Sequence, residues 1–455
     1  MTKGLPSQAT TPAVPGIRRW IGILGLSLLA LGIGPSTAAI SLAYGLLFLF
    51  ALSSWREITV LWHAGWASKA LLLLTLYVII QGVTMGLVQD RPAFSGDDLQ
   101  HVVRTVSLGT VLAGWAVYAC RMSPRILGSL FVAGLAIATV EAFLEHGWEL
   151  FSMRRMHYLR SPNEVGLFGG TIFLVGLFIA GSASLRCWHH RRQPAIAAAL
   201  GLLAFVLVIS GLWLWLQSGS RSTWVGLTVA LGLITAAGAL MVVRQRRGMM
   251  SFAVGTAIVA TIVAGLGTFY ADDIRPRIER ELPSIAAIAE GDTESLMAGR
   301  DAGHNARFKI WAVAINEIGE RPLTGWGSGS VTSHFNIAVD DGKLRDGRDH
   351  YHNLYLHLAV FIGMPFVALG LAAYGSVFRQ AAASLIRESG GRADVGWFIA
   401  AWGLFFAVSS LFQVRMHSAY GAAFFILFTG MAYGLYLHTR LPEQRRATES
   451  ETETA

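Results

Sequence analysis

Three arginines lie beside apolar runs in settings that favour anion binding: Arg160, Arg221 and Arg307. A guanidinium offers a planar fork of donors that fits phosphate oxygens, and the free amides of a helix N-terminus also favour anions. Together the three side chains would suit a pyrophosphate at a membrane surface. The alternative, favoured for any one of them taken alone, is that each arginine reaches a lipid phosphate or pairs with a loop carboxylate.

His352 is the best candidate for proton transfer, because an unperturbed imidazole titrates near neutral pH. The alternative is a histidine that caps or packs against the helix that follows it. Asn353 is expected to contact substrate, or to fix the turn or the imidazole ring. The weaker candidates are His304, His334, His350 and His357.

The sequence predicts neither a metal nor a cofactor. It has no HExxH, CxxC or EF-hand spacing and no P-loop or dinucleotide fingerprint. The acidic pairs at 97–98, 272–273 and 340–341 are interpreted as chance features of solvated segments. The turn from Gly325 to Gly329 lacks the strand–turn–helix context of a phosphate-binding loop, so it is a weak candidate for a phosphate cradle.

The elements that position these residues are membrane helices. The chain is 53% hydrophobic and 14% charged, whereas soluble proteins carry about 25% charged residues. Its net charge of +8 comes from basic clusters between apolar runs, which is a topology signal and indicates membrane lipids, not nucleic acid, as partners. Cys120 and Cys187 both lie beside basic clusters, so no structural disulfide is expected.

Twelve apolar runs approach the roughly 20 residues that cross a bilayer. The predicted fold is therefore an all-α polytopic membrane protein with about twelve transmembrane helices. The runs lie near residues 20–35, 38–55, 69–88, 101–120, 126–143, 164–185, 194–216, 221–243, 249–270, 352–378, 395–412 and 419–438.

The first run has two interpretations. Arg18 and Arg19 precede it and small residues follow at 36–39, as in a cleaved signal peptide. The preferred interpretation is an uncleaved span that forms a tight helical hairpin with the second run.

The distribution of basic residues predicts that both termini are cytoplasmic. With that orientation, nineteen of the 36 Lys and Arg residues fall on the inner side and six in the short outer loops. Residues 271–351 then form one large periplasmic loop, which holds fourteen of the 28 acidic residues. A loop of this length is usually functional.

The large loop is expected to be partly helical, at 274–289 and again at 305–320. In the second helix, Phe308, Trp311, Ala312, Ile315 and Ile318 lie on one face at helical spacing. The resulting division is transmembrane helices 1–9 in residues 1–270, the loop in 271–351, transmembrane helices 10–12 in 352–438, and a polar cytoplasmic tail in 439–455.

Five short segments resemble the O-antigen ligase family of bacterial envelope biogenesis, within the wider superfamily of O-antigen ligases and polymerases. They are Ser161-Pro162-Asn163-Glu164, Ser220-Arg221-Ser222-Thr223-Trp224, Arg307-x-x-x-Trp311, Pro322-Leu323-x-Gly325-x-Gly327, and His352-Asn353 with Gly363 after it. The resemblance covers roughly residues 160–370. The motifs are individually short, and their order carries the similarity.

The resemblance implies an inverting membrane glycosyltransferase of the bacterial inner membrane, with its active site facing the periplasm. It would transfer O-antigen glycan from undecaprenyl pyrophosphate to a sugar hydroxyl of lipid A–core during lipopolysaccharide assembly. Arg221 and Arg307 would bind the pyrophosphate and His352 would act on the acceptor hydroxyl, with Arg160 a less secure member because its motif is looser. No metal and no nucleotide is required by this chemistry.

Three other functions stay open. An O-antigen polymerase would use the same donor with a second lipid-linked glycan as acceptor, and a protein O-oligosaccharyltransferase would use a protein hydroxyl. A flippase or transporter of lipid-linked glycan would fit the number of spans. It is disfavoured because the sequence shows no matching halves and its charged residues gather at the outer ends of the spans.

Overall fold

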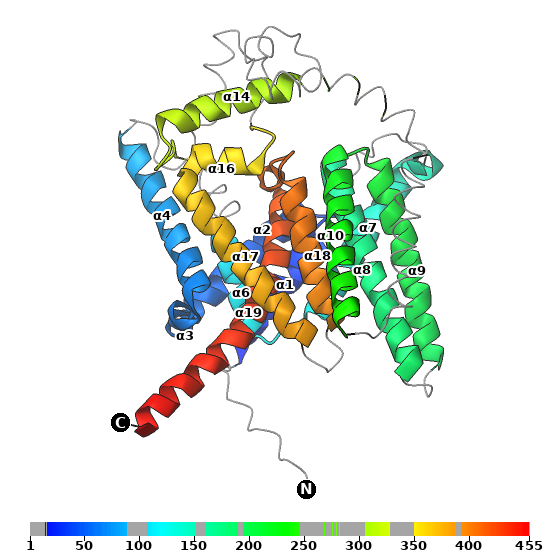
Figure 1. The fold of residues 1–455 in the computed structure, drawn as a ribbon, viewed down its shortest axis with the longest axis horizontal. Coiled ribbons are helices and arrows are strands. Elements are labelled where there is room, and N and C mark those ends of the chain that lie inside the picture. The colour runs from blue at the N-terminus through cyan, green and yellow to red at the C-terminus, as the bar shows by residue number, and fades with distance from the viewer. Residues whose placement is uncertain are drawn as a thin grey trace. The chain divides into compact units, whose positions relative to one another are not determined.

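The protein is described by a computed structural model that covers residues 16–88, 107–151, 161–189, 194–245, 305–327, 350–387 and 393–454, together with isolated positions. Over these ranges the chain is helical and contains no strand, which confirms the predicted all-α class (Figure 1).

Within the described residues, ten of the predicted apolar runs each correspond to one helix. The run 249–270 lies outside them except for one position. The ten helices are α1 (Ile17–Gly32), α2 (Thr37–Ser53), α4 (Trp66–Val88), α6 (Leu108–Ala119), α7 (Pro124–His146), α8 (Pro162–His189), α9 (Pro194–Gln217), α10 (Arg221–Gln245), α18 (Ala393–Ser409) and α19 (Ala419–Thr454).

Length and hydropathy give a lower number of membrane spans. Of the described helices, six are long and apolar enough to cross a membrane, or seven if one bent pair counts as a single span. Helices α6 and α18 are apolar but shorter. The chain is therefore a helical membrane protein, and the number twelve stays a prediction.

The run 352–378 was wrongly predicted as one continuous span. It is divided into α16 (Leu354–Ile362) and α17 (Met364–Arg387) by Gly363, whose φ is +87°. A side chain at this position would collide with the backbone carbonyl of Leu323. The helix ends here because a second chain segment lies against it and only glycine fits between them.

The helices fall into two compact units. The first comprises residues 1–219, 368–400 and 415–455, and the second comprises residues 220–367 and 401–414. Within the described ranges, the predicted site residues Arg221, Arg307, His352 and Asn353 all belong to the second unit.

Small residues hold the first unit together. At the α8–α9 crossing, a Cβ added at Gly169 would lie 2.5 Å from the backbone nitrogen of Trp215. At Gly430 of α19, an added Cβ would lie 2.6 Å from the side chain of Ala113 in α6. Such close backbone approach is the usual basis of helix association in membranes. Helix α19 forms the centre of this unit, because 94% of its apolar stretch, within Ala419–Leu441, is buried.

The predicted hairpin of the first two runs is confirmed. Helices α1 and α2 pack side by side, and the hydroxyl of Ser36 caps α2 by accepting from the amide of Ala39 at 3.2 Å. Helix α2 then bends by 83° into the short segment formed by α3 (Trp55–Ile58) and η1 (Thr59–His63).

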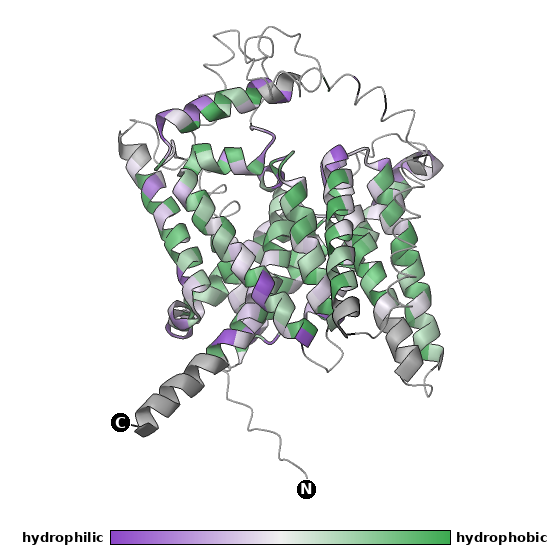
Figure 2. Ribbon diagram, in the orientation of Figure 1, coloured by the Kyte–Doolittle hydropathy of each residue, from purple (hydrophilic) through white to green (hydrophobic). Residues whose placement is uncertain are grey.

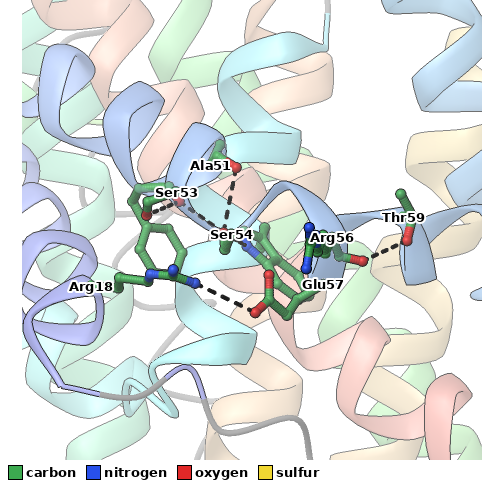
Figure 3. A network of polar contacts seen from close by, with 9 residues as sticks. Arg18, Ala51, Ser53, Ser54, Arg56, Glu57 and Thr59 are labelled. Carbon is green, nitrogen blue, oxygen red and sulfur yellow. Dashed lines mark hydrogen bonds and ion pairs between the residues drawn. The ribbon is translucent and has the colours of Figure 1, made fainter.

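Polar contacts fix this bend (Figure 3). The hydroxyl of Ser54 donates to the carbonyl of Phe50 at 2.8 Å, and Arg18 of α1 lies 3.7 Å from the carboxylate of Glu57. An exposed ion pair of this kind contributes at most about 1 kcal/mol. The buried serine, which also accepts from the indole of Trp115, is therefore the more important restraint.

In the second unit, α14 (Asn305–Glu320) lies beside α16 (Figure 1). The helix has the predicted limits, and Trp311 and Ile318, two of the residues placed on one face, pack against a buried core. Ile310, Val313 and Ala314 form a core with Tyr351 and Val360, whereas Ile315 is 59% exposed.

The sequence of α14 leaves open which of its sides is buried. Residues 310–315 are all apolar, so hydrophobic periodicity defines a helix there but cannot define which side is buried. Figure 2 shows α14 as a mixture of hydrophilic and hydrophobic positions along its length. Its neighbour α16 decides which side is covered.

The polar segment 439–455 continues α19 through Thr454. The other predicted helix of the large loop, at 274–289, lies outside the described residues apart from single positions.

Candidate active site

Arg221 is the first residue of α10 and is half-buried. Gly219, with φ +59°, turns the chain into the helix, and the carbonyl of Ser220 accepts from the amides of Thr223 and Trp224, both at 3.1 Å. The guanidinium therefore belongs to the first turn of a helix, where the amide dipoles favour an anion, as the sequence predicted.

Helix α10 is fixed tightly against the end of α18. A Cβ at Gly226 would lie 2.9 Å from the carbonyl of Phe405 and would also collide with the hydroxyl of Ser409. The position of Arg221 is thus set by the last two turns of α18.

Arg307 is half-buried in the first turn of α14. One turn further along, the indole Nε1 of Trp311 donates to the backbone carbonyl of Tyr351 at 3.0 Å. The two ends of the Arg-x-x-x-Trp motif therefore have separate roles. Trp311 ties α14 to the residue that precedes His352, whereas Arg307 lies in the first turn of the helix.

Asn353 caps α16. Its side-chain oxygen accepts from the backbone amides of Tyr355 at 2.9 Å and Leu356 at 3.2 Å. This occupies the amide oxygen in stabilising the helix start. Of the three roles foreseen for Asn353, the geometry supports fixing the turn. It also excludes His352 as the helix cap.

His352 has a left-handed backbone with φ +51°. Non-glycine residues seldom adopt this conformation, and where they do it is often associated with function. The side chain is half-buried, and its Nδ1 lies 3.0 Å from the Oε1 of Gln413. The ring is therefore held on one side by a defined partner.

Gln413 also contacts His350, and we refer to His350, His352 and Gln413 as the histidine cluster. The Nε2 of Gln413 lies 3.3 Å from the Nε2 of His350, and the two imidazole centroids are 4.1 Å apart. Two further hydrogen bonds fix the cluster to the end of α18: Leu354 N–H to the carbonyl of Ser410 at 2.9 Å, and the Tyr355 hydroxyl to the carbonyl of Ala407 at 2.7 Å.

The glycine-rich segment is a joint between α14 and α16. The amides of Trp326 and Gly327 donate to the carbonyls of Val360 and Phe361 at 2.8 and 3.0 Å. The amide of Met364 donates to the carbonyl of Pro322 at 2.9 Å. Because these amides are used in backbone pairing, the segment is no phosphate cradle at these positions.

Two other groups near His352, the side chains of His357 and Tyr351, are unsuited to act as the base. His357 is buried within α16, with its ring centroid 6.0 Å from that of Tyr351. Burial, and then the nearby charge of Glu317, raise the pKa of Tyr351 above its usual value. Its phenol therefore stays protonated over the physiological range.

Arg160 lies outside the described residues. The motif that follows it belongs to the first unit, where Glu164 is buried and accepts a hydrogen bond from Ser418. In the same place the buried Arg415 donates to the backbone carbonyl of Asn163. We refer to Asn163, Glu164, Arg415 and Ser418 as the buried charge cluster.

Three residues of these clusters, Gln413, Arg415 and Ser418, were not singled out from the sequence. Arg415 is one of the six basic residues counted in the short outer loops. The sequence signal that could have identified them was their position just after an apolar run. The other candidates also lie at predicted outer ends of such runs. Nothing in the sequence indicates which side chains they contact.

Among the described residues no group of three His, Cys, Asp or Glu side chains is arranged to hold a metal ion. The acidic pairs noted in the sequence lie outside the described residues.

Comparison with known proteins agrees with the motifs. A family model described as O-Antigen ligase matches residues 204–371. No curated protein matches the chain. The matched segment runs from α9 into α17 and contains Arg221, Arg307, His352 and the glycine joint. Over this segment the chain is similar to the O-antigen ligase family, which supports a membrane enzyme of the O-antigen ligase and polymerase type.

Proposed function

We propose that the protein is an inverting glycosyltransferase that joins the O-antigen glycan of undecaprenyl pyrophosphate to a sugar hydroxyl of lipid A–core. The observation that carries this proposal is the hydrogen bond from Trp311 to the carbonyl of Tyr351, which joins the arginine-bearing helix α14 to the segment of His352. The hydrogen bond thereby fixes the helix that carries Arg307 to the segment that carries His352, the proposed proton acceptor.

The proposed chemistry is a single displacement. Arg221 and Arg307 bind the pyrophosphate and neutralise the charge that develops on it as the bond from the anomeric carbon to the phosphate oxygen breaks. The acceptor oxygen forms the new bond to the anomeric carbon from the opposite face, which inverts the configuration. Nε2 of His352 takes the hydroxyl proton, and pyrophosphate leaves with the bonding electron pair, still attached to its lipid.

Both arginines lie in first turns of helices, α10 and α14, where the helix dipole adds to the attraction for phosphate. His352 lies outside any helix and is held through Nδ1, so the other nitrogen of its ring is directed elsewhere. The different positions of the arginines and of His352 support a donor site made of the arginines and an acceptor site made of the histidine. Arg160 would complete the donor site.

The proposed setting is the inner membrane, with both termini cytoplasmic and residues 271–351 in the periplasm. The basic residues in the first turn of α1 and within α3 support this orientation. Reporter fusions after Gly291 and after Arg446 test it. A cytoplasmic signal from the first fusion, or a periplasmic signal from the second, would overturn both the topology and the mechanism.

The test of function is reconstitution. Purified protein is incubated with lipid-linked glycan and lipid A–core, without nucleotide and in the presence of EDTA, and the product and its anomeric linkage are determined. We expect glycan joined to lipid A–core with inverted configuration. Elongated lipid-linked glycan would identify a polymerase, and glycan on an added protein acceptor would identify an oligosaccharyltransferase. Activity that returned only with magnesium would instead assign a role to the acidic pairs.

A further inference from the structure

Gln413 is a polar side chain at the end of α18 with both of its amide atoms directed at histidines. It belongs to the second unit, as do His350 and His352. The motif that carries the family resemblance ends at Gly363, and the matched segment ends at residue 371, so neither includes it.

The polarity of the contacts defines the protonation of the histidines. An amide oxygen accepts hydrogen bonds and cannot donate them. With Oε1 of Gln413 3.0 Å from Nδ1 of His352, the proton of the neutral ring must be on Nδ1. The lone pair then lies on Nε2, which is the nitrogen able to accept a proton.

The other end of the amide keeps this orientation. Nε2 of Gln413 donates to Nε2 of His350 at 3.3 Å, so His350 accepts the bond as a neutral ring with its own proton on Nδ1. Rotating the amide by half a turn would reverse both bonds and would require both histidines to change tautomer together.

The arrangement also suits the charged state of His352. When Nε2 takes a proton, the ring becomes a cation that still donates from Nδ1 to the same amide oxygen. A hydrogen bond with one charged partner is stronger than a neutral one. The contact therefore stabilises the imidazolium that the transfer step produces.

We infer that Gln413 is a positioning residue that holds His352 in the tautomer with a basic Nε2, with His350 fixing the orientation of the amide. This inference rests on the proposed function, in which that nitrogen receives the proton of the acceptor hydroxyl. Gln413 does not contact the reacting atoms and acts through His352.

Two substitutions at the same position give opposite predictions. Gln413→Glu retains an acceptor for Nδ1–H of His352, whereas Gln413→Met retains only the approximate size. We expect Gln413→Met to lower kcat by about 10- to 100-fold, the usual cost of losing such a supporting contact, with the KM for the lipid-linked donor unchanged. Gln413→Glu should keep kcat at least tenfold above that of the Met variant.

Gln380→Met is the matched control. Gln380 is a half-buried glutamine of α17 that accepts from Arg440 and donates to Ser376, and it contacts no histidine. It should retain normal kcat and KM. Thermal denaturation of all variants in detergent separates loss of turnover from loss of fold.

The outcomes separate the inference from the function on which it rests. A Gln413→Glu variant as slow as Gln413→Met would show that the amide donates to His352, which reverses the assigned tautomer. Normal kcat in Gln413→Met would show that Gln413 does not position the histidine, provided that His352→Ala is inactive in the same assay. If His352→Ala is itself active, the proposed base is wrong, and the inference about Gln413 is overturned with it.

Discussion

The short stretch after α18 contributes to two polar clusters of different character. Gln413 belongs to the histidine cluster of the second unit, and Arg415, two residues later, belongs to the buried charge cluster of the first. The histidine cluster is half-buried and made of neutral hydrogen bonds. The other contains two charged residues whose exposed fractions are only 3% and 4%, for Arg415 and Glu164.

This difference separates stability from chemistry. Two buried charges cost several kcal/mol to desolvate, so each must be held by partners, and the removal of one leaves the other poorly compensated. The half-buried imidazoles of the histidine cluster place no charge in a buried setting, so they cost little in stability. We therefore expect substitutions in the buried charge cluster to affect folding and those in the histidine cluster to affect turnover.

The largest expected effect on the rate is that of His352→Ala. A positioned general base contributes about 10²–10⁴-fold, so turnover should fall by that order while donor binding stays nearly intact. The measurement is kcat in the reconstituted transfer assay, with donor affinity determined separately. Thermal stability should be unchanged, because α16 keeps its cap at Asn353. A variant with normal turnover would return His352 to a purely structural role.

The opposite pattern is expected for Arg415→Met. The substitution removes the buried donor to the carbonyl of Asn163 and the positive charge of the cluster that also holds Glu164, and should lower the free energy of unfolding by about 1–3 kcal/mol. Two measurements check this: the yield of protein extracted from membranes and the midpoint of thermal denaturation should both fall. Adding Glu164→Gln to the same chain should recover part of that loss.

The turnover of the Arg415→Met protein that remains folded should be close to normal. A stable but inactive Arg415→Met variant would contradict the comparison, and it would assign Arg415 to the chemistry.

Arg221→Ala and Arg307→Ala should each reduce transfer by about 10²–10³-fold, the usual effect of removing one group that stabilises developing charge. Protein abundance should not change, since both side chains are half-buried at helix starts. Lysine at either position should restore activity only in part, because it keeps the charge but loses the bidentate fork.

The control for the arginines is Arg125→Ala. Arg125 is an exposed arginine that pairs with Asp394 at 3.1 Å in the first unit. Its loss should leave the rate of transfer unchanged. It should change the free energy of unfolding by at most about 1 kcal/mol. Full activity of Arg221→Ala would assign that arginine to contact with lipid phosphate.

The sequence was sufficient where local pattern determines structure. Hydrophobic runs located nearly every helix that the structure describes, and the limits of α14 follow from Asn305 at its start and the Pro322 turn after it. It was insufficient where tertiary contact decides. The break at Gly363 exists because the 322–327 segment pairs with residues 360–364, which are about 40 positions away in the chain.

The same limit applies to the site. Residue type and order identified Arg221, Arg307 and His352, because guanidinium and imidazole groups carry recognisable chemistry. Gln413 was missed because a side-chain amide is neither an acid, a base nor a charged group, so its type does not mark it as a site residue. Its role arises only from contact with two histidines more than 60 residues earlier.

The smallest expected effect is that of Asn353, which distinguishes a helix cap from a substrate ligand. Asn353→Ala removes the acceptor for the amides of Tyr355 and Leu356 and should cost about 0.5–2 kcal/mol of stability. Asn353→Asp and Asn353→Ser preserve a capping oxygen, so both should retain near-normal stability and kcat, although they differ in charge and size from the amide. Thermal denaturation and the transfer assay, performed on the three variants together, provide the comparison. If the amide bound the glycan, all three would raise KM alike, and the capping residues would give no rescue. Recovery of both stability and kcat by aspartate and serine, but not by alanine, would place Asn353 with the framework that holds His352.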